Sequence, residues 1–141
     1  MLAAGERLLA AAQAAQAYGL AAAHLGLDEP VVVISTADDR AQRDYRILYN
    51  PEITSLSDET EMGMEGSVAL PGIEVPITRY IGAEIAYDDA DGKRLALALD
   101  GFVARVAQHE IDQVEGIFFL RRVSPVKRDI ALRKFQKMQR L

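Results

Sequence analysis

A histidine and a glutamate stand side by side at His109 and Glu110. Zinc hydrolases commonly carry the pattern H-E-x-x-H on a helix, where two histidines four residues apart share one face and the glutamate serves as general base. Here the fifth position is Gln113, and its amide is a poor metal ligand compared with a neutral imidazole. By itself the broken pattern is a weak signal, because a helix that merely contains His-Glu also explains it.

The residues around this pair predict the element that positions it. Apolar residues recur at helical spacing after Asp100-Gly101, and Gly116 is suited to end the helix. Before it, two alternating stretches, 81–87 and 95–99, flank Asp91-Gly92, which offers the positive φ that a tight hairpin turn needs. We therefore expect a hairpin that leads into a central helix.

The remaining segments favour short strands and separate helices. Residues 2–18 are rich in alanine and predict a helix that stops at Gly19, and residues 30–35 and 46–49 predict short strands. Residues 54–64 are acidic and weakly patterned, which indicates a surface loop. A last helix is expected from Ser124, with Pro125 at its first position. The predicted class is α+β, with short antiparallel strands and segregated helices.

Length and composition limit the kind of protein. The chain has 141 residues, which predicts a single domain over 1–141. It has no cysteine, so disulfides and thiolate metal sites are excluded. No apolar run is long enough to cross a bilayer, and the N-terminus lacks the basic start of a signal peptide. We expect a cytoplasmic protein with no membrane partner.

Three segments, in order, resemble the signature of the peptide deformylases. Residues 17–24, AYGLAAAH, resemble that family's G-x-G-L-A-A-x-Q. Residues 65–69, EGSVA, resemble E-G-C-L-S, and residues 108–116, QHEIDQVEG, resemble Q-H-E-x-D-H-L-x-G. The resemblance runs from about Gly19 to about Arg122 and implies the peptide deformylase fold around the central helix. Family members also carry a segment before the first helix, including a leading strand, and we expect this chain to lack it.

The resemblance implies a metal-dependent amidase. In the family a cysteine and two histidines bind iron or another divalent ion, whose bound water attacks the formyl carbon of an N-terminal formyl-methionine. The glutamate after the first histidine moves the proton. The glutamine of the first motif and the backbone N–H after the cysteine stabilise the oxyanion.

These roles transfer to the present residues one at a time. Glu110 matches the general base and His109 matches one metal ligand, whereas Ser67 and Gln113 stand where the cysteine and the second histidine should be. The implied substrate-binding positions are Gly19, Leu20, His24 and Val68; His24 replaces the glutamine of the first motif, and Val68 keeps the backbone N–H.

Two of the three ligand positions are therefore degraded, because a serine hydroxyl is neutral at pH 7 and metals bind the deprotonated form. The first expectation is a deformylase-like protein without normal deformylase activity, with no cofactor expected and with a peptide N-terminus or a small molecule in its pocket.

Three alternatives stay open at this stage. His24 could join His109 and Glu110 in a weak site for iron, zinc or nickel. The chain could be an active deformylase, or a related amide hydrolase, that uses the altered ligands. Without any metal, Ser67 could act as a nucleophile with His109 or His24 as its base.

The C-terminal segment differs from the rest of the chain in charge. Residues 121–141 hold eight Lys or Arg against one acid, Asp129, although the whole chain has a net charge of −5. We expect residues 124–141 to form a basic helix, and the family resemblance implies the ribosome as a polyanionic partner. A solvated helix is the alternative. A homodimer that covers an open sheet edge is a further expectation.

Overall fold

A computed structural model describes residues 1–140, so Leu141, the last residue of the expected basic helix, lies outside the described residues. The first half of the chain contains α1 (Leu2–Ala15), β1 (Gly19–Ala21), the 3₁₀ turn η1 (Ala22–Leu25), β2 (Val31–Ser35), β3 (Tyr45–Leu56) and β4 (Thr60–Glu65). The second half contains β5 (Val75–Tyr80), β6 (Gly82–Asp88), β7 (Arg94–Asp100), α2 (Gly101–Val114), η2 (Phe119–Arg122) and α3 (Pro125–Gln139).

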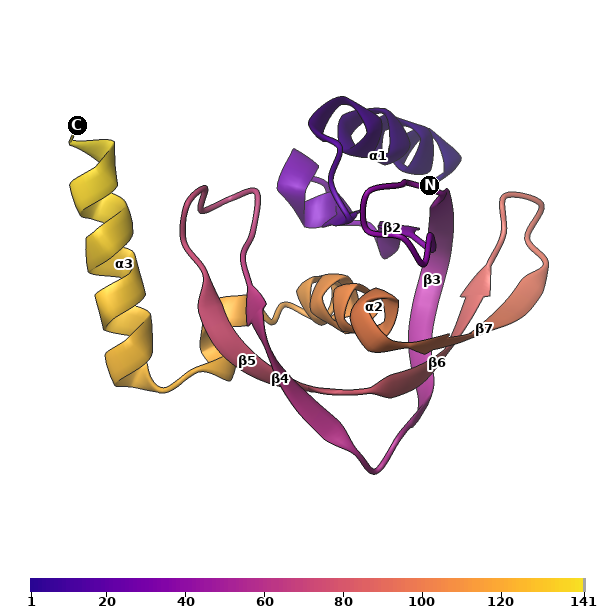
Figure 1. Ribbon diagram of the computed structural model, residues 1–141. Coiled ribbons are helices and arrows are strands. Elements are labelled where there is room, and N and C mark those ends of the chain that lie inside the picture. Colours follow the sequence, from indigo (N-terminus) through magenta and orange to yellow (C-terminus); the bar gives the residue numbers. More distant parts are fainter. Residues whose placement is uncertain (141) are drawn as a thin grey trace.

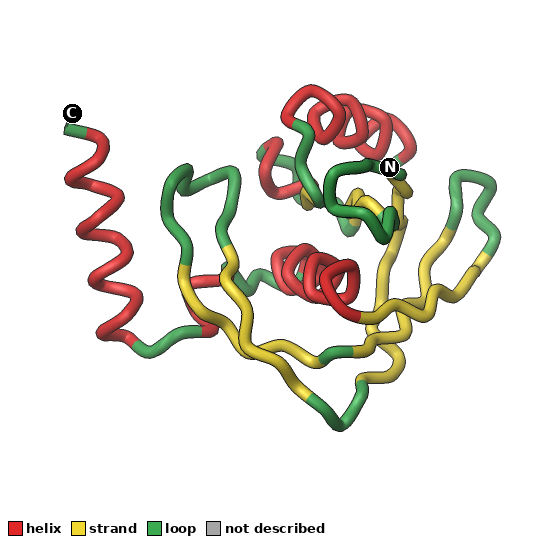
Figure 2. The backbone as a smooth tube through the Cα atoms, viewed as in Figure 1, coloured by secondary structure: helices red, strands yellow, loops and turns green. Residues whose placement is uncertain are grey.

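Two antiparallel sheets surround the central helix α2 (Figures 1 and 2). The larger sheet has the strand order β1-β2-β3-β6-β7, and the smaller one pairs β4 with β5. Figure 1 shows α1 on the far side of β1 and β2 from α2, and α3 standing apart at the other end of the molecule. The predicted α+β class, with short antiparallel strands around the helix that carries His109 and Glu110, is confirmed.

Strand β2 lies between α1 and α2, and four of its five residues are apolar. Its five residues are all buried, because successive side chains point to opposite faces of the sheet and both faces are covered. Val32 and Ile34 pack in the cluster under α2, whereas Val31 and Val33 pack in the cluster under α1.

The predicted hairpin and the predicted start of the last helix are confirmed. Strands β6 and β7 pair in register from Gly82 with Asp100 to Asp88 with Arg94, and Gly92 takes a φ of 81° in the turn. At α3 the Ser124 hydroxyl accepts a hydrogen bond from the Lys127 N–H at 3.2 Å, and Pro125 follows it.

Three expectations about elements are wrong. The surface loop expected at 54–64 is instead the end of β3 and most of β4, whose side chains are mostly exposed, so no apolar alternation marks them. The short strand 46–49 extends to twelve residues because Asn50, at a φ of 48°, and a shift of register carry the chain past Pro51. The first helix ends at Ala15 because Gln16 takes the left-handed conformation.

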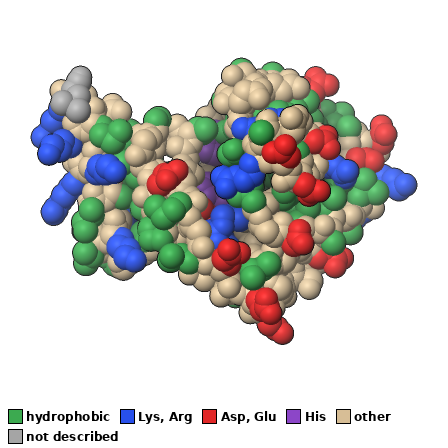
Figure 3. Space-filling model, viewed as in Figure 1, with side chains coloured by type: hydrophobic (Ala, Val, Ile, Leu, Met, Phe, Trp, Pro, Cys, Tyr) green, Lys and Arg blue, Asp and Glu red, His purple; other side chains and the backbone are tan. Residues whose placement is uncertain are grey.

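Helix α3 contacts the rest of the protein through few side chains, and most of its residues are exposed to solvent. Ala131 and Phe135 pack on a cluster that includes Ile73, Ile77 and Phe119. Basic side chains gather along this helix in Figure 3, while acidic side chains gather on the opposite part of the molecule. Within residues 1–140, no helix is both long enough and apolar enough to span a membrane.

Candidate active site

A cavity of about 330 Å³ lies between the β1 region and the segment that follows β4. Six of the eight residues that the sequence assigns to a site line it: Gly19, His24, Ser67, Val68, His109 and Glu110. The other two do not line it. Leu20 is buried in the cluster under α1 and pairs with Val33 through its backbone. Gln113 lies one helical turn after His109 and contacts that histidine.

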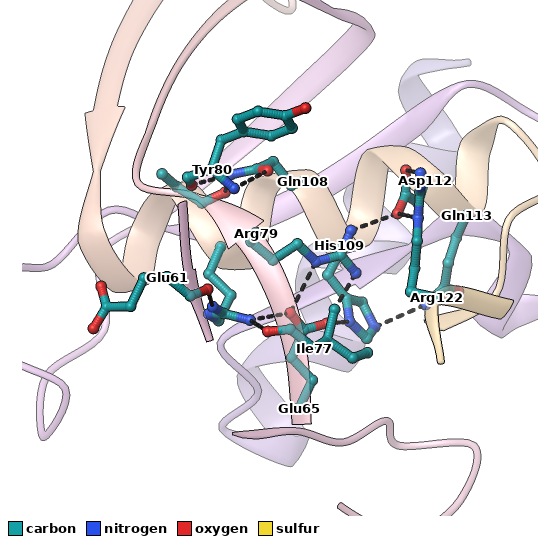
Figure 4. A network of polar contacts seen from close by, with 12 residues as sticks. Glu61, Glu65, Ile77, Arg79, Tyr80, Gln108, His109, Asp112, Gln113 and Arg122 are labelled. Atoms are coloured by element: carbon teal, nitrogen blue, oxygen red, sulfur yellow. Dashed lines mark hydrogen bonds and ion pairs between the residues drawn. The ribbon is translucent and has the colours of Figure 1, made fainter. Parts of the chain in front are cut away.

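Both ring nitrogens of His109 have partners, as Figure 4 shows. Nδ1 lies 2.8 Å from Oε1 of Glu65, and Nε2 lies 3.1 Å from Nε2 of Gln113. A carboxylate only accepts hydrogen bonds, so Nδ1 carries a proton, and an amide nitrogen only donates, so Nε2 presents its lone pair to Gln113. That lone pair, the one with which a histidine binds a metal, accepts a hydrogen bond from the Gln113 amide.

A buried ionic network holds His109 in this orientation. Glu65 accepts hydrogen bonds from Arg79 at 2.8 and 2.9 Å and from Arg105 at 2.6 Å. Burial alone would raise the pKa of Glu65, but the hydrogen bonds from Arg79 and His109 outweigh it and lower the pKa to about 2. Glu65 is therefore ionised at neutral pH and fixes the tautomer of the imidazole.

The same network continues along α2. Asp112, one turn after His109, accepts a hydrogen bond of 2.6 Å from Arg79 and two, of 2.7 and 3.0 Å, from Arg122. Figure 4 shows this chain of pairs running from Glu65 to Arg122. Breaking such a pair would leave an uncompensated charge inside the protein, so the network gives the site a rigid support.

Glu110 is the least satisfied polar group in the site. Among residues 1–140, its Oε1 is the one buried side-chain oxygen or nitrogen without a hydrogen-bond partner. Burial raises the pKa of this carboxyl to about 7. Gly19 allows the close approach of β1, because a Cβ there would lie 3.0 Å from Oε2 of Glu110. A carboxyl of this kind can accept or return a proton near neutral pH.

His24 enters the cavity from η1, at the first turn after β1. Its Nδ1 lies 3.0 Å from both the nitrogen and the oxygen of Ala21, so the Ala21 backbone occupies Nδ1 in either tautomer. Nε2 is then the ring nitrogen available to a ligand. Burial lowers the pKa of His24, which favours the neutral ring. A neutral imidazole with an N–H at Nε2 can donate to an oxygen, as a glutamine amide would.

Ser67 lies on the opposite wall, in the turn after β4. Its hydroxyl accepts a hydrogen bond of 3.1 Å from the Ala69 N–H. Among the described residues, neither histidine forms a hydrogen bond with it. The arrangement therefore offers no base for Ser67 as a nucleophile, a role that needs such a contact.

Several residues that shape the site were not predicted as site residues from the sequence. Arg79, Arg105 and Asp112 build the ionic network, and Arg40, Tyr18 and Phe102 line the cavity. Asp112 could have been predicted to lie near the site, because it follows His109 by three residues and therefore lies on a neighbouring position of the same helix face. Arg40 could not have been predicted in this way, since it comes from a polar loop.

Comparison with known proteins shows the family of the chain. The family model described as polypeptide deformylase matches residues 3–129. A peptide deformylase of Chromohalobacter salexigens is 40% identical over 126 residues, covering 89% of this chain and 73% of that protein. A peptide deformylase-like protein of Brucella melitensis is 37% identical over 133 residues, covering 94% and 79%.

Solved structures show the same architecture. The peptide deformylase of Ehrlichia chaffeensis superposes with a TM-score of 0.88 at 28% identity, covering 97% of this chain and 82% of that one. The one from Synechococcus elongatus, in complex with actinonin, gives 0.81 at 32% identity, covering 90% and 70%. This chain belongs to the peptide deformylase family.

Family membership corrects one expectation. Members of this family are metal-dependent enzymes, so the first expectation, of no cofactor, is wrong. The ligand positions of this chain nevertheless match such an ion poorly. His109 offers one imidazole lone pair that Gln113 already occupies, and Ser67 offers a neutral hydroxyl. Within residues 1–140, no three His, Asp or Glu side chains are grouped to hold a metal.

Proposed function

We propose that this protein binds the acylated N-terminus of a peptide in the cavity and removes formyl groups far more slowly than the peptide deformylases to which it is similar. The observation that carries the proposal is the contact between Gln113 and Nε2 of His109, 3.1 Å long, at the position where the family resemblance implies two histidine ligands. A side-chain amide and a serine hydroxyl are weak donors to a divalent ion compared with imidazole and thiolate.

The groups that would contact an acyl group support retained binding. His24 presents Nε2 at the cavity wall, and the backbone N–H of Val68 stands where the resemblance implies an oxyanion contact. Glu110 keeps an unpaired carboxyl oxygen in the buried part of the same site. A cytoplasmic location, where formylated chains are made, is part of the proposal.

The test compares hydrolysis with binding in one preparation. Protein loaded with Fe²⁺, Ni²⁺ or Zn²⁺ is assayed for release of formate from formyl-Met-Ala, and binding of the same peptide is followed by calorimetry. We expect saturable binding with kcat/KM at least about 100-fold below that of the Chromohalobacter salexigens relative, since loss of even one outer partner of a metal costs about 10–100-fold. Equal rates would identify an ordinary deformylase, and absence of binding would remove the proposed role.

A second proposal concerns α3, which we infer to be a docking element for a polyanion, with the ribosome as the candidate partner. Its support is the position of the helix apart from the rest of the fold (Figure 1) and its row of exposed basic side chains. Arg133, Lys137 and Arg140 are spaced by four and three residues, so they share one face. The apolar side chains Ala131 and Phe135 attach the helix to the body on another face.

This second proposal predicts salt-dependent co-sedimentation with ribosomes. Each phosphate contact contributes about 0.7–0.9 to the slope of log affinity against log salt, so Arg133→Gln, Lys137→Gln and Arg140→Gln together should lower that slope by about two. The matched control carries Arg7→Gln, Arg46→Gln and Lys93→Gln, three exposed residues elsewhere with the same change of net charge. Equal sedimentation of both triple variants, or none for the native chain, contradicts the proposal.

A further inference from the structure

Arg40 is held at the rim of the cavity by aromatic side chains. It is exposed and comes from the loop between β2 and β3, yet it lines the same cavity as His24 and Glu110. Its guanidinium carbon lies 3.8 Å from the centre of the Phe102 ring and 5.5 Å from that of Tyr18. These two rings meet edge to face, with their centres 4.8 Å apart. Stacking of this kind fixes the plane of the guanidinium and leaves its N–H edge free.

A second arginine of the same loop, Arg43, has a purely structural role. Arg43 lies 4.0 Å from the centre of the Tyr18 ring, and its N–H groups donate to the backbone oxygens of Gln16, Arg40 and Gln42. Arg43 thus ties the loop to the end of α1 and lies over the face of the Tyr18 ring. Its donors are used within the protein.

Arg40 differs because its donors are not used. Among residues 1–140, its guanidinium has no hydrogen-bond or ion-pair partner. Asp38 and Asp39 precede it in the loop, but neither is paired with it, and Asp39 caps the Ala41 N–H at 2.9 Å. Glu74 also lines the cavity, on the side formed by the segment after β4. The Arg40 side of the cavity therefore presents a positioned cation with free donors to whatever enters.

We propose that Arg40 binds a carboxylate of the ligand, so that the cavity selects N-acylated peptides that carry a negative charge close to their acylated end. The inference rests on the proposed function, because it takes the acyl end to lie by His24 and Glu110. The planar guanidinium matches a carboxylate with two parallel hydrogen bonds. In a peptide such a carboxylate has two sources: the C-terminus of a di- or tripeptide, or an acidic side chain near the N-terminus of a longer chain.

The experiment measures affinity by calorimetry for two matched pairs of peptides. Formyl-Met-Ala is compared with formyl-Met-Ala-amide, which tests the C-terminal source. Formyl-Met-Glu-amide is compared with formyl-Met-Gln-amide, which tests the side-chain source. In at least one pair we expect the charged peptide to bind about three- to tenfold more tightly, the range for a partly exposed charge-assisted pair. The preference should shrink as salt is raised.

Three variants assign the preference to Arg40. Arg40→Gln should abolish the difference within each pair while leaving the affinity for the amides unchanged. Arg40→Lys should restore it only in part, because an ammonium keeps the charge but loses the planar stack on Phe102. Arg7→Gln, on the exposed face of α1, makes the same change of net charge and should keep the full preference.

The outcomes separate this inference from the proposed function. If both pairs bind without any preference, or if the preference survives Arg40→Gln, the role of Arg40 is wrong and the proposed binding of acylated peptides stands. If none of the four peptides binds to the native protein, the proposed function fails and the role of Arg40 fails with it.

Discussion

Ser67→Cys combined with Gln113→His and His24→Gln is expected to give a protein that binds a divalent metal at least about 100-fold more tightly than the native chain and releases formate from formyl-Met-Ala correspondingly faster. The reason is geometric. Positions 109 and 113 already lie in contact on one face of α2, so the substitution replaces an amide that blocks Nε2 of His109 with a second imidazole. Glu65 and Arg79 already orient the first imidazole.

The matched control is the same triple variant with Glu110→Gln. It should gain the metal to the same extent, because Glu110 is not one of the ligand positions, but it should not gain the activity, because the group that moves the proton is lost. Metal content is measured by elemental analysis and activity by formate release. If the triple variant takes up no more metal than the native chain, the surrounding scaffold no longer fits an ion and the assignment of Ser67 as a ligand position is wrong.

Glu110→Gln in the otherwise native chain is expected to stabilise the protein at pH 8 by about 3 kcal/mol and to leave its stability unchanged near pH 4. The carboxyl has a pKa of about 7 in the folded protein, because burial disfavours its charged form, against 4.5 in the unfolded chain. Each unit of difference corresponds to about 1.36 kcal/mol. Between pH 4.5 and pH 7 the carboxyl has released its proton in the unfolded chain but keeps it in the folded protein.

The sign follows from that difference. The free energy of unfolding of the native chain falls as the pH rises from about 4.5 to about 7, and the full penalty is present above that range. A glutamine of the same shape does not ionise, so the variant shows no such fall. Chemical denaturation at several pH values, in buffer with a chelator so that no ion neutralises the carboxylate, gives the comparison.

Glu84→Gln is the control for this experiment, since Glu84 is exposed on β6 and its loss should not change the stability in this way. A native chain whose stability does not fall between pH 4.5 and 7 would show that water or another group satisfies Oε1 of Glu110. Loss of stability on Glu110→Gln at pH 8 would show that the ionised carboxylate is a favourable part of the folded protein.

The sequence by itself determined the elements whose patterns are local. The alternation from Ile81 to Leu99 specified the β6–β7 hairpin, and Ser124 with Pro125 specified the start of α3. The three motifs were enough to indicate the family, and positions 109 and 113 had to share a face because a helix repeats every 3.6 residues. The exposed strands at 54–64 were not predicted, because strands with polar side chains toward solvent lack the period-two pattern of apolar residues.

The tertiary structure decided how these residues interact. Glu65 meets Arg79, Arg105 and His109 across separations of 14 to 44 residues, and the burial of Glu65, Arg79 and His109 makes the network matter for stability and tautomer. The cavity wall formed by Arg40 and Phe102 joins a loop to the start of α2, which no local pattern encodes. Only packing could show that Gln113 occupies the lone pair of His109 while Glu110 stays buried and unpaired, because both facts depend on what surrounds a side chain and not on its type.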